Sequence, residues 1–311
     1  MKRKEFLQSG LIASGLSIVP DILAAKSAPS RKSIRFAFIS DIHVKPGAIP
    51  EAGMAKAIGH VQNLKPKVDF IINGGDYIMD ALAATKESVQ KQWDVYHSIM
   101  KATNKLTVYP CIGNHDIYGW FHKTPDTTDP LYGKNWVMKE LEMPERYYHF
   151  KKENWNFIVL DSTQNNPAGG YIGKIDELQL TWFSNKLAEI PSSEHICLVS
   201  HIPILSICAG LFFNKTEANG DLMIKRNLMH SDFLSLKTLF NKYPNIKTCL
   251  SGHVHMQDEV HYRGINYYCN GAICGDWWYG PYLEFDPAYA IFDFYEDGSC
   301  KREIVNYGFE R

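Results

Sequence analysis

The stretch IRFAFISDIH, residues 34–43, decides the class of fold that this chain adopts. It begins as a largely apolar run typical of a buried strand and ends in two polar residues, Asp41 and His43. Further apolar runs follow at 68–73, 106–112, 155–160, 196–200 and 248–251. Between them, amphipathic helix patterns lie at about 50–64, 85–103, 176–190 and 230–243. This alternation predicts an α/β fold whose strands are buried between layers.

The composition is that of an ordinary globular protein. The chain has 311 residues, of which 45% are hydrophobic and 22% are charged. This length fits one large domain with additions, or two domains, and is enough to bury a stable core. The net charge of −1 supplies no general positive field, so we do not expect the protein to bind nucleic acid.

The C-terminal part, residues 258–311, has a different pattern. Two short apolar runs flank Arg263-Gly264, and two more flank the turn residues 296–298. Both arrangements are typical of β-hairpins. We therefore expect this part to be β-rich and antiparallel.

The N-terminus has the layout of a signal peptide. Lys2, Arg3 and Lys4 precede a short apolar stretch at 11–19, and small residues follow near 24–28. The apolar stretch is too short to span a bilayer. We expect a signal peptide over residues 1–28 and a mature domain over 33–311 that has no transmembrane segment. The protein would then be exported, periplasmic or extracellular, by a Sec or a Tat route.

Polar residues that can bind a metal or a phosphate follow five of the six apolar runs. In chain order they are Asp41, His43, Asp76, Asn114, His115, Asp116, His201, His253 and His255. Sheets in α/β proteins place their sites at the carboxyl ends of strands. We therefore expect these side chains to meet at one edge of the sheet.

The residue types and their spacing indicate a metal site. In an extended backbone, residues i and i+2 point the same way, so Asp41 with His43, and His253 with His255, can face one ion. Carboxylate, imidazole and amide ligands suit Mn, Fe, Zn or Ni better than Ca. Seven ligands exceed the needs of one tetrahedral ion and fit two divalent ions that share a carboxylate. Such a pair would leave the site positive, which favours an anionic phosphate ester.

These motifs resemble those of the calcineurin-like metallophosphoesterases, which run D-x-H, G-D, G-N-H-(D/E), H and G-H-x-H. All five occur here in that order between residues 41 and 255. The resemblance implies a four-layer α/β/β/α sandwich of two mixed β-sheets flanked by helices. It also implies the ligand sets: one metal on Asp41, His43 and His255, the other on Asn114, His201 and His253, and Asp76 as the bridge.

The same resemblance implies a function. The protein would hydrolyse phosphomonoesters or phosphodiesters with a hydroxide activated between the two metals. His115 would protonate or stabilise the leaving oxygen, and Asp116 would orient its imidazole. Asn114, His115 and His201 would contact the substrate. A non-catalytic metal-binding scaffold on the same fold is the alternative, although such scaffolds usually lose ligands or the catalytic histidine, and this chain keeps them.

Several aromatic and basic residues have two open interpretations. Trp277 and Trp278 either wall the substrate cleft or pack against the core, and Lys225 with Arg226 either binds phosphate or is a solvated pair. The long loops 118–146 and 203–229 are candidate binding elements. Asp80 either supports the site or is an exposed acid. Aromatic walls favour an organic substrate, such as a nucleotide or a lipid headgroup.

Overall fold

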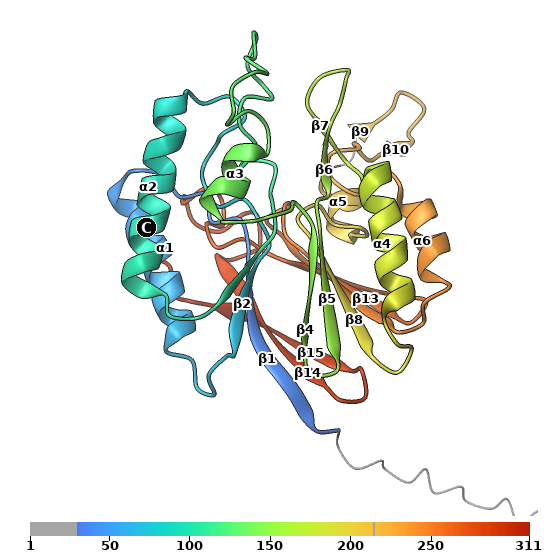
Figure 1. Cartoon of the computed structure of the whole chain (residues 1–311). Helices are drawn as coiled ribbons and strands as arrows, with labels where there is room; N and C mark the ends of the chain where they lie inside the picture. Colours follow the sequence, from blue (N-terminus) through green and yellow to red (C-terminus); the bar gives the residue numbers. More distant parts are fainter. Residues whose placement is uncertain (1–29, 214) are drawn as a thin grey trace, which may run out of the picture. The chain divides into compact units, whose positions relative to one another are not determined.

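The computed structural model describes residues 30–213 and 215–311, which build two mixed β-sheets (Figure 1). The first sheet has the order β15-β14-β1-β2-β3. Its strands are β1 (Lys32–Ile39), β2 (Phe70–Asn73), β3 (Val108–Pro110), β14 (Ala288–Tyr295) and β15 (Cys300–Asn306). β1, β2 and β3 are parallel to one another, whereas β14 is antiparallel to both of its neighbours. The C-terminal hairpin β14–β15 therefore extends the sheet that the N-terminal strand begins.

The second sheet has the order β12-β13-β11-β8-β5-β4. Its strands are β4 (Tyr148–Lys152), β5 (Trp155–Leu160), β8 (His195–Ser200), β11 (Ile246–Ser251), β12 (Gln257–Tyr262) and β13 (Ile265–Asn270). The four inner strands are parallel, and the edge strands β4 and β12 are antiparallel to their neighbours. The two predicted C-terminal hairpins thus form, but they join different sheets.

Helices cover the outer face of each sheet (Figure 1). α1 (Ala48–Gln62) and α2 (Lys86–Thr103) lie on the first sheet, and α4 (Glu177–Glu189) and α6 (Phe233–Phe240) lie on the second. Thr85 caps the N-terminus of α2 and Asp176 caps that of α4, since these side chains accept the backbone N–H of Ser88 and Gln179. The predicted four-layer α/β/β/α sandwich is confirmed.

Shorter elements lie in the connections between these layers. They are α3 (Asn135–Glu140), α5 (Ile207–Leu211), β6 (Thr163–Asn165), β7 (Tyr171–Gly173), β9 (Lys215–Thr216) and β10 (Leu222–Met223). β6 pairs with β7, and β9 pairs with β10, both antiparallel. These small hairpins fall in or beside the long loops that the sequence marks as candidate binding elements.

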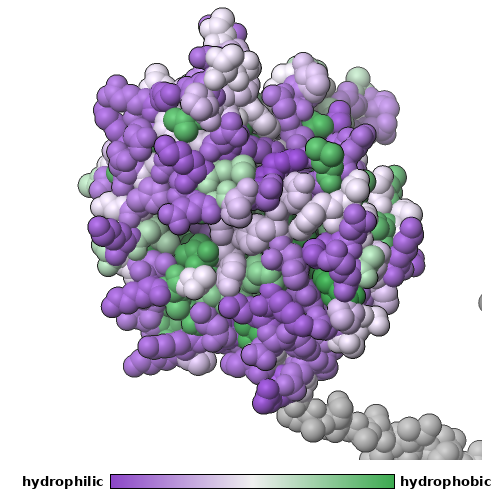
Figure 2. Space-filling view, in the orientation of Figure 1, coloured by the Kyte–Doolittle hydropathy of each residue, from purple (hydrophilic) through white to green (hydrophobic). Residues whose placement is uncertain are grey.

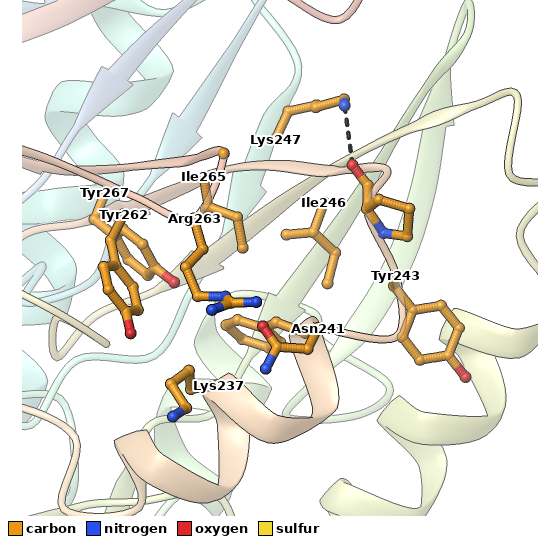
Figure 3. A pocket seen from close by; sticks show the side chains of 12 residues that line it. Lys237, Asn241, Tyr243, Ile246, Lys247, Tyr262, Arg263, Ile265 and Tyr267 are labelled. Atoms are coloured by element: carbon orange, nitrogen blue, oxygen red, sulfur yellow. Dashed lines mark hydrogen bonds between the residues drawn. The ribbon is translucent and has the colours of Figure 1, made fainter.

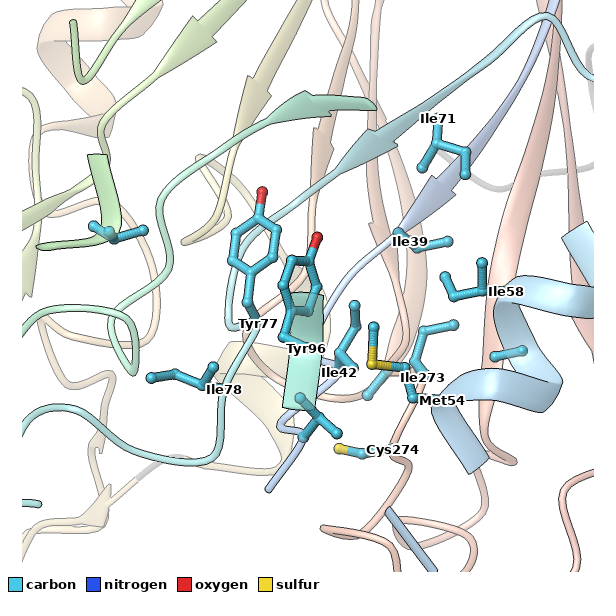
Figure 4. Close-up of a cluster of buried hydrophobic side chains, with 14 of the residues drawn as sticks. Ile39, Ile42, Met54, Ile58, Ile71, Tyr77, Ile78, Tyr96, Ile273 and Cys274 are labelled. Atoms are coloured by element: carbon cyan, nitrogen blue, oxygen red, sulfur yellow. The ribbon is translucent and has the colours of Figure 1, made fainter. Parts of the chain in front are cut away.

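The core explains why the strand at 34–40 is apolar on both faces. Phe36 of β1 lies between the sheets, where its ring stacks on Phe70 at 5.1 Å and meets Phe157 of the second sheet edge-on at 5.5 Å. On the other face, Ile39 belongs to a buried cluster that includes Met54 of α1 and Tyr96 of α2 (Figure 4). A strand buried on both faces needs a continuous apolar run.

The surface and the N-terminus complete the description. The face seen in Figure 2 is mostly hydrophilic, and its hydrophobic residues form small separate groups. Within residues 30–213 and 215–311, none of the helices has the length and apolarity needed to cross a bilayer. The expected signal peptide at 1–28 lies outside the described residues.

Candidate metal centre

The structure brings all seven predicted ligands to one edge of the sandwich. Each follows the carboxyl end of a parallel strand: Asp41 and His43 follow β1, Asp76 follows β2, Asn114 follows β3, His201 follows β8, and His253 and His255 follow β11. Asp41, His43, Asp76, Asn114 and His201 are essentially inaccessible to solvent. Because the strands come from both sheets, the centre lies where the two sheets meet.

The first group of ligand atoms comes from Asp41, His43 and His255. Nε2 of His43 lies 3.1 Å from Nε2 of His255. Oδ1 of Asp41 lies 3.5 Å from the latter nitrogen and 3.9 Å from the former. Ligands that share one ion at a bond length of about 2.0–2.2 Å lie about 3–3.6 Å apart, so most of this spacing fits a common ion.

The second group comes from Asn114, His201 and His253. Nε2 of His201 lies 3.0 Å from Oδ1 of Asn114 and 3.2 Å from Nδ1 of His253. Both distances fit ligands of one ion.

Asp76 lies between the two groups. Its Oδ2 atom is 3.4 Å from Nε2 of His43 and 3.2 Å from Nε2 of His201. Its Oδ1 atom accepts the backbone N–H of His115 at 2.8 Å, which fixes the orientation of the carboxylate. One oxygen of Asp76 is therefore positioned to bridge two ions.

Three of the imidazoles have their outward ring nitrogens held by backbone carbonyls. The pairs are His201 Nδ1 with Gly74 O at 2.8 Å, His253 Nε2 with Asn227 O at 2.7 Å, and His255 Nδ1 with Gly275 O at 2.7 Å. A carbonyl accepts a proton but cannot donate one, so each outward nitrogen carries the hydrogen. The inward nitrogens then keep lone pairs, which is the arrangement that metal-binding histidines show.

Burial and charge set the ionisation of the centre. Burial lowers the pKa of His43 well below its ordinary value and the pKa of His253 to about 3, so both rings are neutral. Burial acts to raise the pKa of Asp76, but His201 and His115 outweigh it and hold that pKa well below its ordinary value. Burial acts to lower the pKa of His201, but Asp76 outweighs it and raises that pKa to about 9. The candidate bridge is therefore an ionised carboxylate that attracts positive charge to its neighbours, which suits a divalent cation.

The backbone at the ligands differs from the expected geometry. Asp41, His43, His253 and His255 have φ values of +54°, +47°, +76° and +58°, so neither D-x-H nor H-x-H is extended. Their side chains converge because left-handed turns follow the strands, not because residues i and i+2 alternate along a strand. Such conformations cost free energy in non-glycine residues and concentrate at functional sites.

Two motif glycines permit close approach of the backbone. A Cβ atom on Gly113 would lie 2.2 Å from the Asp76 backbone nitrogen, and one on Gly252 would lie 2.3 Å from Oδ2 of Asp41. Any larger residue would push these carboxylates out of place.

The expected role of Asp116 is wrong. Its carboxylate accepts three backbone N–H groups, from Asp76, Tyr77 and Gly113, at 2.8–2.9 Å. Asp116 thus holds together the loops that carry Asp76 and Asn114. The groups that face Nδ1 of the His115 imidazole are the Met79 carbonyl at 2.9 Å and Oδ1 of Asp80 at 3.9 Å.

His115 lies in a cavity of about 190 Å³ at the centre. The cavity is also lined by Asp76, Asn114, His253 and His255, together with Tyr171, Phe213, Leu228, Val254, Trp277 and Tyr282. His201, also expected to contact the substrate, is fully buried behind this lining. The cavity is therefore lined partly by the candidate metal ligands and His115, and partly by apolar and aromatic side chains.

The two tryptophans have different roles. The Trp277 ring lies 4.1 Å from the His43 ring and 5.1 Å from the His115 ring, and it walls the cavity. Trp278 is 3% exposed and donates its Nε1–H to the His43 carbonyl at 3.0 Å. Of the two interpretations of Trp278, the structure excludes a cleft wall and supports the other, because the side chain packs in the core and supports the backbone of a candidate ligand.

Sequence reasoning missed several residues of the site. Tyr171 and Tyr282 line the cavity but belong to no motif, and Asn227 and Gly275 act through backbone carbonyls, which carry no side-chain signal. Cys274 lies beside the His43–His255 pair, but burial raises its thiol pKa well above the ordinary value.

A second, larger cavity of about 310 Å³ lies elsewhere, beside the loop between β12 and β13 (Figure 3). Lys237, Arg263 and Tyr262 are among its lining residues, and Lys247 donates to the Pro244 carbonyl at 2.9 Å. None of the predicted site residues lines it.

Two curated relatives match most of the chain. The chain is 23% identical, over 248 residues, to a 3′,5′-cyclic-nucleotide phosphodiesterase of Nostoc sp., covering 78% of this chain and 79% of that protein. It is 24% identical to a probable cyclic nucleotide phosphodiesterase of Colwellia psychrerythraea, covering 89% and 97%.

Solved structures show the same fold. A dimetal phosphatase from Danio rerio superposes with a TM-score of 0.62 at 13% identity, covering 89% of this chain and all, 100%, of that one. A purple acid phosphatase from yellow lupin seeds superposes with a TM-score of 0.58 at 13% identity, covering 90% and 52%. A family model of calcineurin-like phosphoesterases matches residues 34–257. The chain therefore belongs to the calcineurin-like phosphoesterase family.

Proposed function

We propose that this phosphoester hydrolase uses two divalent ions and cleaves a small phosphodiester, with 3′,5′-cyclic nucleotides as the first substrates to test. The observation that carries the proposal is the position of Asp76. Its Oδ2 atom lies 3.4 Å from the ligand atom of His43 and 3.2 Å from that of His201. A single ion could bind only one of the two ligand groups, the one around His43 or the one around His201, and the other group would have no cation.

The donor set fits two ions. Asp41, His43 and His255 would hold one ion, Asn114, His201 and His253 would hold the other, and Asp76 would bridge them. Ions bound there would supply positive charge and lower the pKa of a coordinated water. Their identity among Mn, Fe, Zn and Ni is a matter for metal analysis, because these ligand types suit all four.

His115 is positioned to move the leaving-group proton. Its Nδ1 lies 2.9 Å from the Met79 carbonyl, so this nitrogen carries a hydrogen and Nε2 is left for the substrate. The Asp80 carboxylate, 3.9 Å from Nδ1, puts a negative charge beside the ring. The side chain is 24% exposed, whereas His43 and His201 have none of their surface exposed. A partly exposed imidazole can reach a substrate that enters the cavity.

The cavity walls favour an organic phosphoester. Trp277, Tyr171 and Tyr282 surround the ligands and offer faces on which a sugar or a base can pack. Cyclic nucleotides are named as substrates of the Nostoc and Colwellia relatives. Together these observations favour a nucleotide over a lipid headgroup as the substrate.

Hydrolysis assays test the proposal. The purified protein would be assayed against cyclic AMP, bis-p-nitrophenyl phosphate and mono-p-nitrophenyl phosphate with Mn, Zn and Ni. We expect the diesters to be cleaved faster than the monoester, and the His115→Ala variant to lose most of this activity. Absence of hydrolysis with every metal would favour the alternative, a non-catalytic metal-binding scaffold.

We also propose that residues 1–28 direct export of the protein. The basic residues 2–4 followed by a short apolar stretch support this proposal. Cell fractionation and N-terminal sequencing of the full-length protein test it. A processed N-terminus near residue 28 is expected outside the cytoplasm, and an intact Met1 in the cytoplasm would contradict export.

A further inference from the structure

A third cavity, of about 380 Å³, adjoins the metal centre and has no role in the chemistry described so far. Its lining includes Phe121, Tyr171, Lys225, Arg226 and Asn227. Phe121 belongs to the loop 118–146, and the last three residues belong to the loop 203–229. Both loops thus contribute to one cavity, and the hairpin β6–β7 supplies the rest of its lining.

This cavity adjoins the reaction site at two residues. Tyr171 lines both cavities, and its ring lies 6.1 Å from the ring of the candidate ligand His253. The Asn227 side chain lies beside the hydroxyl of Tyr171, and the Asn227 carbonyl accepts from Nε2 of His253 at 2.7 Å. A ligand in this cavity is therefore only one side chain away from the metal centre.

The backbone that carries the basic residues is fixed on β7. The N–H of Gly173 donates to the Arg226 carbonyl at 2.7 Å, and the Gly173 carbonyl accepts the N–H of Ser231 at 2.8 Å. A Cβ atom at position 173 would lie 2.9 Å from the Met229 carbonyl oxygen, so glycine permits this close approach. Gly173 thus binds the loop at Arg226 and again at Ser231, on either side of residues 227–230. These two hydrogen bonds fix the position of the loop relative to the neighbouring Tyr171.

The charge of the cavity is positive and uncompensated. Lys225 and Arg226 are its only charged lining residues. Within the described parts of the chain, neither side chain forms an ion pair. By contrast, Lys134 and Arg146, elsewhere near the sheet edge, both pair with Asp161. Unpaired cations in a concave surface beside a phosphoester site favour an anionic group, and Arg in particular matches phosphate geometry.

The cavity also offers an aromatic face. The rings of Phe121 and Tyr171 are nearly parallel, with an angle of 14° and 6.2 Å between their centroids. Phe121 remains 45% exposed, so a large apolar ring is open to solvent beside the two cations. A planar base or a sugar next to a phosphate would cover this ring.

We propose that this cavity is a subsite for a second phosphate of the substrate, recognised by Lys225 and Arg226. The inference rests on the proposed function, because it assumes that the scissile phosphate occupies the metal centre. Within the proposed class of phosphodiesters, it favours nucleotides that carry a phosphate in addition to the one that is cleaved over 3′,5′-cyclic nucleotides that carry only the scissile one. Phosphodiesters without a second phosphate are then poorer substrates.

A matched pair of substrates tests the subsite. The p-nitrophenyl ester of thymidine 5′-phosphate contains the scissile bond, and its 3′-phosphorylated form adds only the second phosphate. We expect kcat/KM to be about tenfold or more higher for the 3′-phosphorylated form, the range that one or two charge-assisted hydrogen bonds give. In the double variant Lys225→Met/Arg226→Gln, this ratio should fall toward one.

The control variant is Lys123→Met. Lys123 is exposed and lies on the loop that carries Phe121, but it does not line the cavity. Its replacement removes one positive charge without touching the subsite, so the substrate ratio should stay at its wild-type value. An equal loss of preference in this variant would mean that general electrostatics explains the preference, and would overturn the subsite.

A binding measurement separates the subsite from catalysis. Isothermal titration calorimetry would compare thymidine 3′,5′-bisphosphate with thymidine 5′-monophosphate, which need not be hydrolysed. The bisphosphate should bind about tenfold or more tightly to the wild type and lose this advantage in the double variant. Equal affinities would overturn the subsite even if both esters are cleaved. Preferential bisphosphate binding without any hydrolysis would instead leave the subsite standing and count against the proposed function.

Discussion

Nδ1 of His253 faces Nε2 of His201 across 3.2 Å, and the other nitrogen of each ring is held by a backbone carbonyl. Two neutral imidazoles in this arrangement would direct lone pairs at each other. A proton or a cation must therefore lie between them. Because Asp76 and Asn114 direct oxygen atoms at the same point, a divalent cation satisfies all four groups at once.

Removal of the metals should destabilise the fold. An ion that binds only the folded chain stabilises it by about 4 kcal/mol when its concentration is about 1,000 times Kd. We expect a chelator to lower Tm by several degrees and Mn to restore it, as measured by differential scanning calorimetry. The Asp76→Ala variant should respond little to Mn, whereas His261→Ala, which changes an exposed histidine of β12, should respond like the wild type. A Tm that is insensitive to chelation would contradict the proposed metal centre.

His115→Ala should separate chemistry from metal binding. Loss of a general acid lowers kcat by about 10²–10⁴-fold. The ring of His115 is outside the proposed ligand sets, so the variant should keep the metal content of the wild type. Steady-state kinetics and inductively coupled plasma mass spectrometry measure the two quantities. Loss of both kcat and metal would contradict the assignment of His115 as a general acid, because His115 would then act as a metal ligand.

Asp116→Ala should destabilise the protein strongly. It leaves three backbone N–H groups without their acceptor, and each buried unsatisfied group costs about 1–3 kcal/mol. We expect the free energy of unfolding to fall by about 3 kcal/mol or more in urea denaturation. A stable variant with impaired turnover alone would instead restore the earlier expectation that Asp116 serves His115.

The sequence could predict the layers because both faces of the inner strands are buried, and this leaves long apolar runs. It could also predict which residues meet, since Asp41, Asp76, Asn114, His201 and His253 all follow strands. It could not predict how they meet. The left-handed turns at Asp41 and His253 depend on tertiary contacts, among them the hydrogen bonds from the His253 N–H to the Asp41 carboxylate. The role of Asp116 was likewise hidden, because its partners are backbone groups from other loops.

Asp232 should give the stability a defined dependence on pH. Burial acts to raise the pKa of its carboxyl, but bonds from Nδ1 of His230 at 2.9 Å and the N–H of Ile175 at 3.0 Å hold that pKa below its ordinary value. A depressed folded pKa stabilises the protein above the unfolded value of about 4, and this contribution disappears as the pH falls through the folded pKa.

Comparison with Asp232→Asn isolates this effect. The difference in unfolding free energy between wild type and variant should be constant from about pH 7 to pH 5 and shrink below about pH 4. Urea denaturation at a series of pH values measures it. A difference that stays the same down to pH 3 would show that the carboxylate charge contributes nothing.

The most direct test of the central claim is an anomalous difference map from crystals grown with Mn. We expect two peaks about 3.5–4 Å apart, with Oδ2 of Asp76 within bonding distance of both. One peak should also contact His43 and His255, and the other should contact His201 and His253. A single peak, or two peaks that do not share Asp76, would contradict the two-ion centre.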